Sequence, residues 1–233
     1  MKLEKFINYE FNKTEIENSI EILESKKYKT ERDRNLIRKY KSEIEEYPIL
    51  KYLNENKNIK AIKYIKDMTS QDIKTFEDFE QNTLNCVGTD LITQTINDSF
   101  FRVDIKVLEY YPMHYKTNKT YNGKLVNNEW GIENFIFQVE GKCGTLGWSN
   151  NRYKQTDILM IYIKDTNKIY SFNYKRLVDW INNKINNKEI TEKDYIIFYK
   201  GYGATKTREC IVSIPCDEIP KEVITKIYDV EKV

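Results

Sequence analysis

The spacing of apolar residues changes at Gly88, and this change constrains the fold more than any other feature of the chain. Before Gly88, apolar side chains recur at helical intervals, as at Ile16, Ile20 and Leu23. After it, apolar and polar side chains alternate, as in "FFRVDIKV" (100–107), which is typical of strands. Helices followed by strands predict an α+β or mixed α/β fold. We expect an N-terminal helical arm over 1–70 and an α/β core over 71–233.

The helical arm is predicted to begin with a hairpin of two amphipathic helices. The first starts at the capping sequence "TEIE" (Thr14) and the second at the similar sequence "TERD" (Thr30). The second helix is expected to end at "YP", because the residue before Pro48 disfavours the α conformation. Shorter helices are predicted over 48–54 and 59–68.

The core is predicted to begin with an amphipathic helix over 70–84, which places Glu77 and Glu80 near its flank. The turn-forming sequence "INDS" then separates two strand-like segments, which indicates a β-hairpin. The nearly continuous apolar run "TDILMIYI" favours a central strand. Further elements are expected as a strand over 134–142, an amphipathic helix over 173–185 and a final strand over 209–215.

Composition excludes several kinds of site. The chain has 38 basic and 36 acidic residues and a net charge of +2, so nucleic-acid binding would need a local basic patch. One histidine, and four cysteines without a Cys-x-x-Cys pair, argue against a zinc site. No apolar run is long enough to cross a bilayer, and the N-terminus lacks a secretory signal, so we expect a cytoplasmic protein. Chemistry would then depend on carboxylates, lysine and a hard metal ion.

The segment "VDIKV" offers such chemistry. Asp104 and Lys106 are two residues apart on a predicted strand, so their side chains point the same way. The hairpin brings Asp90 near them, and Glu77 or Glu80 could supply a third carboxylate. Such oxygen ligands suit Mg²⁺ or Mn²⁺, and a metal ion of this kind promotes phosphodiester hydrolysis. The competing interpretation is an ordinary strand whose charged face is solvated.

The order of these segments resembles the PD-(D/E)XK nuclease superfamily, in which an Asp and a later Asp/Glu-x-Lys lie on paired strands. The matching segments are an acid-bearing helix, "GTDL" and "VDIKV", and the blocks "YYP", "FIFQVEG", "GW", "KQTDILMIYI" and "GYG…IVSIP" follow in order. They span residues 75–216 and look like a divergent branch of the phage or mobile-element type. One departure is Thr89, which stands where the motif has proline.

The resemblance implies a restriction-endonuclease-like core, in which a mixed central sheet is flanked by helices, and DNA as the substrate. Asp90 and Asp104 would bind Mg²⁺ or Mn²⁺, and Lys106 would assist the attacking water. The resemblance also implies an acid from the first core helix and a polar residue on the third strand. The candidates for these two roles are Glu77 or Glu80 and Gln138 or Glu140, respectively.

Other functions stay open at this point. The superfamily includes members that have lost catalysis, so the core could be an inactive scaffold whose helical arm binds a protein partner, for instance to inhibit a host defence system. It could also be a DNA-binding module, and the arm could form a homodimer. Basic side chains in two predicted loops suit a nucleic-acid groove or an ordinary exposed loop equally well. They are Lys116, Lys119, Lys124, Lys206 and Arg208.

Overall fold

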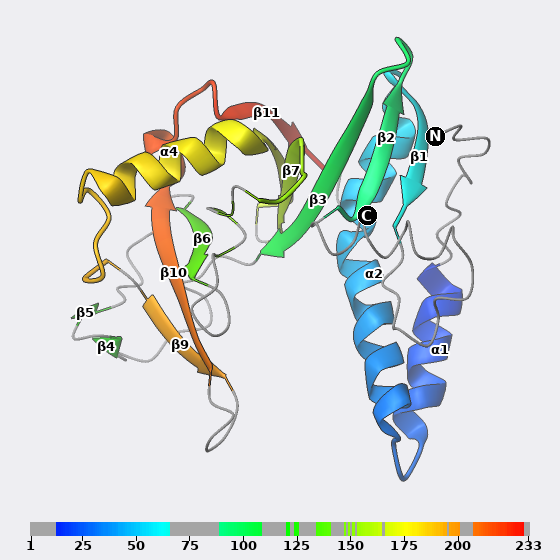
Figure 1. Cartoon of the computed structure of the whole chain (residues 1–233). Helices are drawn as coiled ribbons and strands as arrows, with labels where there is room; N and C mark the ends of the chain where they lie inside the picture. The colour runs from blue at the N-terminus through cyan, green and yellow to red at the C-terminus, as the bar shows by residue number, and fades with distance from the viewer. Residues whose placement is uncertain are drawn as a thin grey trace.

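Six strands form the central sheet of the molecule (Figure 1). The computed structural model describes residues 13–65, 89–108, 120–121, 124–125, 134–140, 147, 149, 151, 153–164, 166–194, 196–200 and 207–230. The pairing of β3 with β7 is parallel and the other pairings are antiparallel, so the sheet is mixed. In spatial order the strands are β1 (Ile59–Tyr64), β2 (Leu91–Thr95), β3 (Phe100–Leu108), β7 (Ile158–Ile163), β8 (Lys168–Asn173) and β11 (Ile224–Asp229).

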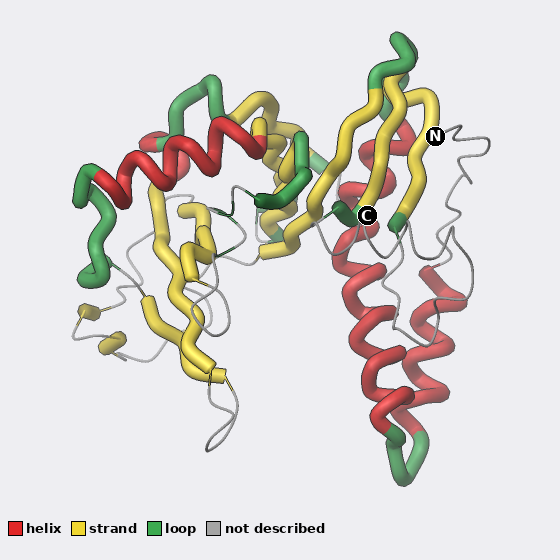
Figure 2. The backbone as a smooth tube through the Cα atoms, in the orientation of Figure 1, coloured by secondary structure: helices red, strands yellow, loops and turns green. Residues whose placement is uncertain are grey.

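Helices flank this sheet on both faces, and a second, smaller sheet lies on one side of it. Figure 2 separates these elements by type. The helices are α1 (Lys13–Ser25), α2 (Glu31–Glu55) and α4 (Tyr174–Asn186), with a short 3₁₀ turn, η4 (Cys216–Glu218). The smaller sheet has the order β6 (Asn134–Glu140), β10 (Thr207–Pro215) and β9 (Ile196–Lys200), and β4 (Thr120–Tyr121) pairs with β5 (Lys124–Leu125). The predicted α+β class is confirmed at this level.

The helical hairpin is present, and its second helix starts where the sequence predicts. Thr30 is the N-cap of α2, and its hydroxyl accepts a hydrogen bond from the Asp33 backbone amide while the Asp33 carboxylate accepts one from the Thr30 amide. This reciprocal pair satisfies two amides that have no partner within the helix. The Lys26 ammonium lies 2.7 Å from the same carboxylate. Helix α1 begins at Lys13, so Thr14 lies inside the helix rather than at its cap.

The expected end of the second helix at Pro48 is wrong, because α2 continues through this proline to Glu55. A proline inside a helix costs about 3 kcal/mol. Immediately after it, Ile49, Leu50 and Leu53 are buried against the sheet. Burying each of these side chains contributes roughly 1.5–3 kcal/mol, so together they outweigh the cost of the proline.

The separate helices expected over 48–54 and 59–68 are also wrong, as far as the structure describes them. Residues 48–54 belong to α2, and residues 59–64 form β1, which pairs with β2 at the edge of the sheet. The predicted helical arm therefore contributes a strand to the central sheet. The predicted domain boundary at residue 70 and the helix expected over 70–84 lie outside the described residues.

The predicted hairpin and central strand are confirmed. Strands β2 and β3 pair across a turn in which Asp98 has a φ of 59°, a left-handed conformation that Asp tolerates better than most residues. Strand β7 lies between β3 and β8, where its run of apolar residues is covered on both faces. The strand over 209–215 exists as part of β10, but it is not the last strand, because β11 follows and pairs with β8.

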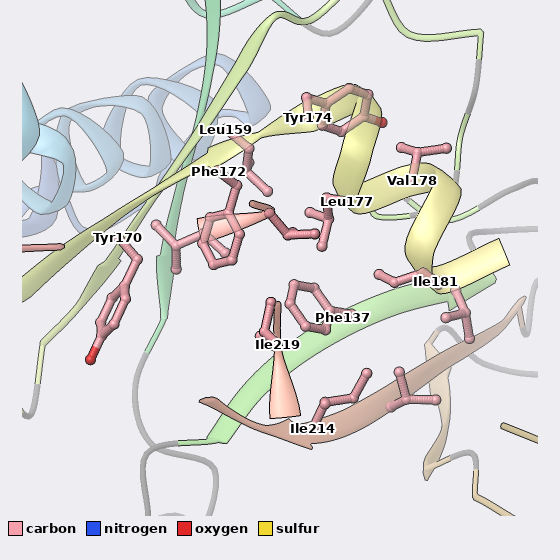
Figure 3. Close-up of a cluster of buried hydrophobic side chains, with 14 of the residues drawn as sticks. Phe137, Leu159, Tyr170, Phe172, Tyr174, Leu177, Val178, Ile181, Ile214 and Ile219 are labelled. Carbon is pink, nitrogen blue, oxygen red and sulfur yellow. The ribbon is translucent and has the colours of Figure 1, made fainter. Parts of the chain in front are cut away.

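Each face of the sheet has its own apolar core. On one face, Ile49, Leu50 and Leu53 of α2 pack with residues of β1, β2, β3 and β7. On the other face, α4 and the smaller sheet pack against β7 and β8, and Figure 3 shows Leu177 and Phe137 turned toward Phe172. Among the described residues, no helix combines the length and apolar character needed to cross a membrane.

Candidate functional site

Asp104 and Lys106 lie together on the α4-facing side of β3. The strand alternates, so Val103 and Ile105 point toward α2 while Asp104 and Lys106 point the other way. The Lys106 ammonium lies 2.6 Å from Asp104 Oδ1. Asp104 is only 1 % exposed, so its carboxylate is not on a solvated face. For this residue, the interpretation as an ordinary solvated strand face is wrong.

Asp90 reaches the same place from the start of the neighbouring strand. It directly precedes β2, and its backbone amide donates to the Val103 carbonyl, which extends the β2–β3 ladder by one position. Its carboxyl oxygen Oδ2 accepts a hydrogen bond from the Ile105 amide at 2.6 Å and lies 4.0 Å from the Lys106 ammonium. The carboxyl groups of Asp90 and Asp104 are close enough for each to affect the pKa of the other. The hairpin thus brings together the two acids and the lysine that the sequence predicts.

Lys154 is a fourth member of the cluster, and sequence reasoning missed it. Its ammonium lies 2.6 Å from Asp104 Oδ2, and its side chain is 16 % exposed. Each oxygen of Asp104 is therefore bonded to a different lysine. Lys154 stands just before β7 in the block "KQTDILMIYI". No short-range sequence pattern relates Lys154 to Asp104; the parallel pairing of β7 with β3 brings the segment before β7 to the cluster.

Burial and charge set the protonation of the two acids in opposite directions. Burial raises the pKa of Asp90 to about 7; the charge of Lys106 opposes this rise, and Asp104 adds to it. Burial also acts to raise the pKa of Asp104, but the charges of Lys106 and Lys154 outweigh it and lower the pKa below the ordinary value. Burial acts to lower the pKa of Lys106, and the two carboxyl groups overcome it and raise this pKa. Near neutral pH Asp104 is therefore ionised, whereas Asp90 is present in both its protonated and its ionised form.

The Lys106 ammonium faces three oxygen atoms. It is surrounded by Asp104 Oδ1 at 2.6 Å, the Ile105 carbonyl oxygen at 2.8 Å and Asp90 Oδ2 at 4.0 Å. Two of these oxygens belong to the consecutive residues Asp104 and Ile105, and the third belongs to Asp90, just before the paired strand β2. All three lie around one positive charge. All-oxygen donor sets of this kind are the ones that Mg²⁺ prefers, with water filling its remaining positions.

The other predicted site residues are not brought to this cluster by the part of the chain that the structure describes. Gln138 and Glu140 lie on β6, which belongs to the smaller sheet and does not pair with β3. Lys124 lies on β5 and Arg208 on β10. The remaining predicted residues lie outside the described residues: Glu77, Glu80, Lys116, Lys119 and Lys206.

Within the described ranges, no group of three or more His, Cys, Asp or Glu side chains gathers where it could hold a metal ion. The described carboxyl groups of the cluster are the pair Asp90 and Asp104. No protein-family model matches the chain, and no curated protein or solved structure matches it significantly. The function therefore has to be argued from the geometry of the cluster itself.

Proposed function

We propose that the chain hydrolyses phosphodiester bonds of DNA with Mg²⁺ or Mn²⁺, using Asp90, Asp104 and Lys106. The observation that carries this proposal is the convergence of two carboxyl groups and the Ile105 carbonyl on the Lys106 ammonium, beside the paired strands β2 and β3. Strongly shifted pKa values of carboxyl groups cluster at functional sites. The arrangement also supports a restriction-endonuclease-like core, because Asp90 and the Asp104-x-Lys106 pair occupy adjacent antiparallel strands.

The donor set fits the proposed ion. Asp90 and Asp104 would hold it together with the Ile105 carbonyl, and the Lys106 ammonium would move away from the oxygens that it now contacts. When bound, the ion lowers the pKa of a water molecule and neutralises charge that develops on the phosphate. Ionisation of Asp90 would accompany binding, since a nearby cation favours its charged form.

The lysines would take the remaining roles. Once displaced from Asp104, Lys106 would hold the attacking water or contact a phosphate oxygen as a point charge. Lys154 stays on Asp104 Oδ2, where it keeps this carboxylate ionised and its geometry fixed. Both ammonium groups add positive charge beside a reaction that develops negative charge on phosphate oxygens.

The test is a cleavage assay with the purified full chain and labelled duplex and single-stranded DNA, in buffers with Mg²⁺, Mn²⁺ or EDTA. Cleavage should occur with either metal, stop with EDTA and stop in Asp90→Asn. This variant keeps a hydrogen-bonding group of the same shape, so circular dichroism should show an intact fold. The matched control is Asp98→Asn, since Asp98 is an exposed acid in the β2–β3 turn that pairs with Lys60. If wild type leaves all DNA intact in both metal buffers, the proposal fails.

One observation favours a second candidate, an inactive nuclease-like scaffold that binds a protein partner. Both oxygens of Asp104 are already bonded to lysines, as in a closed structural ion network. The helical hairpin offers exposed apolar side chains for such a partner, with Ile22 66 % and Tyr28 83 % exposed. This candidate predicts no cleavage and no heat of Mg²⁺ binding by calorimetry. Measurable Mg²⁺ binding that disappears in Asp90→Asn would exclude it.

A further inference from the structure

A cavity of about 890 Å³ adjoins the Asp90–Asp104 cluster. Its walls come from the start of β3, the segment entering β7, and the junction of β8 with α4. Lys154 connects the two places, because its ammonium bonds Asp104 while its side chain lines the cavity. Asp90, Asp104 and Lys106 are not among the lining residues. The cavity is therefore a neighbour of the proposed cleavage site and not the site itself.

Phe100 brings an exposed aromatic ring to this cavity. It lies on the same face of β3 as Asp104, four residues away, which corresponds to about 13 Å along the strand. Its side chain is 48 % exposed, although it belongs to a strand of the central sheet. Exposed aromatic rings beside basic grooves are the groups on which unpaired bases stack. The separation suits a nucleotide near, and not at, the phosphate that the cluster would cut.

Arg102, between Phe100 and Asp104 on the same face, is held in a fixed orientation. Its Nε and Nη2 donate to the two carboxylate oxygens of Asp157, each at 3.1 Å, and its Nη1 donates to Gln155 Oε1 at 2.9 Å. The carboxylate compensates its charge, so the guanidinium offers a flat, oriented surface more than a free positive charge. Planar guanidinium groups stack on nucleic-acid bases in the same way as aromatic rings.

Lys175 is the side chain of the cavity lining to which we assign a phosphate contact. The other two basic side chains of the lining already pair with carboxylates, Arg102 with Asp157 and Lys154 with Asp104. Lys175 is exposed in the first turn of α4. The N-terminal end of a helix carries partial positive charge, which adds to that of the lysine.

We propose that this cavity binds an unpaired nucleotide next to the phosphate that is cut, so that the substrate class is single-stranded or locally unpaired nucleic acid. This inference rests on the proposed function. The cavity volume lies within the range of about 300–1,000 Å³ found for pockets that take small molecules, a size that suits one nucleotide. Bases within a duplex keep their faces stacked on each other and are not available to the Phe100 ring.

The test measures binding separately from cleavage. Fluorescence anisotropy in EDTA would follow binding of labelled oligo-dT, oligo-rU and a duplex of equal length to the full chain. We expect single strands to bind more tightly than duplex, and Phe100→Ala to weaken single-strand binding about tenfold. Phe100→Trp should restore it, because tryptophan retains a stacking surface. Ile96→Ala is the control, since Ile96 is 57 % exposed in the adjoining turn and does not line the cavity.

A second variant tests the phosphate contact. Lys175→Gln should lower the salt dependence of single-strand binding by about 0.7 in the logarithmic slope, which corresponds to one lost phosphate contact. Lys193→Gln, an exposed lysine that is not among the cavity-lining residues, should leave this slope unchanged. The comparison of oligo-dT with oligo-rU tells whether the sugar is read.

The outcomes separate this inference from the proposed function. Equal binding of duplex and single strands, unchanged affinity in Phe100→Ala, or no binding of any nucleic acid would overturn the cavity assignment. Single-strand binding that depends on Phe100 in a chain without metal-dependent cleavage would instead overturn the hydrolase and leave the cavity assignment intact. Cleavage of duplex that is indifferent to Phe100→Ala would do the reverse.

Discussion

Neighbouring residues at the centre of β3 are buried to a similar extent on its two faces by opposite means. Val103 and Ile105 are 1 % and 3 % exposed on the α2 face, and Asp104 is 1 % exposed on the α4 face. Apolar side chains gain free energy from burial without specific partners. A buried charge loses hydration and is tolerated only when other charges and hydrogen bonds replace the lost water. Asp104 accordingly has a lysine on each oxygen.

This difference indicates that the apolar α2 face of β3 stabilises the fold and that the charged cluster on the α4 face has another role. A hydrophobic pair of similar volume is often as stable as a buried ion pair or more stable. The Asp90–Asp104 cluster, with its neutral and ionised carboxyl groups side by side, is therefore not the arrangement that stability alone would favour. This is the physical reason to seek a function there, and the following variants test the contrast.

The largest effect is expected from Asp104→Asn. Removal of the carboxylate leaves the ammonium groups of Lys106 and Lys154 without their closest counter-charge, and breaking a buried pair in this way costs about 3–5 kcal/mol of unfolding free energy. Urea denaturation measures this loss. Asp98→Asn removes an exposed carboxylate from the same hairpin and should change stability little. Similar values for both variants would break the contrast between the two faces.

Asp90→Asn is expected to act in the opposite direction and to depend on pH. The folded-state pKa of Asp90 is raised to about 7 from 3.8, so its favourable contribution is complete below pH 4 and is lost as pH rises through 7. Each unit of this shift corresponds to about 1.4 kcal/mol. Asp90→Asn has no carboxyl group to ionise, so it does not lose this stability as the pH rises. Its melting temperature should therefore exceed that of wild type at pH 8 and match it near pH 4.

The same thermal unfolding experiment can be repeated with added Mg²⁺. An ion that Asp90 and Asp104 bind only in the folded state would stabilise that state. We expect this stabilisation in wild type at pH 8, where Asp90 is ionised. Asp90→Asn should show no such gain. Thermal unfolding with and without Mg²⁺ measures both. Stabilisation of wild type and variant by the same amount would place the ion elsewhere.

Ile105→Val tests the apolar face with a smaller change. The loss of one buried methyl group should cost about 0.5–1.5 kcal/mol, because α2 packs closely on this position. The effect should not vary with pH, since the residues of this core that surround it carry no ionisable carboxyl or ammonium group. A pH-dependent loss, measured by urea denaturation at pH 5 and pH 8, would mean that the two faces are coupled.

The smallest effect is expected from Lys26→Met in the helical hairpin. Lys26 pairs with Asp33 at 2.7 Å, close to the 2.6 Å of the lysine pairs of Asp104, but its side chain is 45 % exposed. Exposed pairs contribute about 0–1 kcal/mol. The same substitution at Lys154, which is 16 % exposed, should cost more. Equal losses in urea denaturation would show that burial does not set the strength of these pairs.

Local signals in the sequence predicted several elements and three of the four residues of the cluster correctly. The turn at Asp98 and the alternation of β3 placed Asp90, Asp104 and Lys106 together, because a hairpin fixes register over short distances. The capping box at Thr30 marked the start of α2. Lys154 was missed because its contact with Asp104 joins residues 50 positions apart, and no local pattern reports such a pairing.

Errors arose where tertiary burial overrode local preference. Pro48 predicts a helix end, but the sheet that buries Ile49 and Leu50 keeps α2 intact beyond it. The 59–64 segment has no strong periodicity, and it forms a strand because its backbone pairs with the edge of β2. Likewise Gln138 is on a strand as expected, but strand order places it in the smaller sheet.

By itself, the sequence determined the α+β class, the hairpin and the row of charges on one side of β3, since all three follow from short-range periodicity and turn chemistry. Only the tertiary structure decided that Asp104 within this row is buried, that Lys154 pairs with it and that a cavity lies beside the cluster. The physical reason is that the segment entering β7, which carries Lys154, reaches Asp104 from a distant part of the chain.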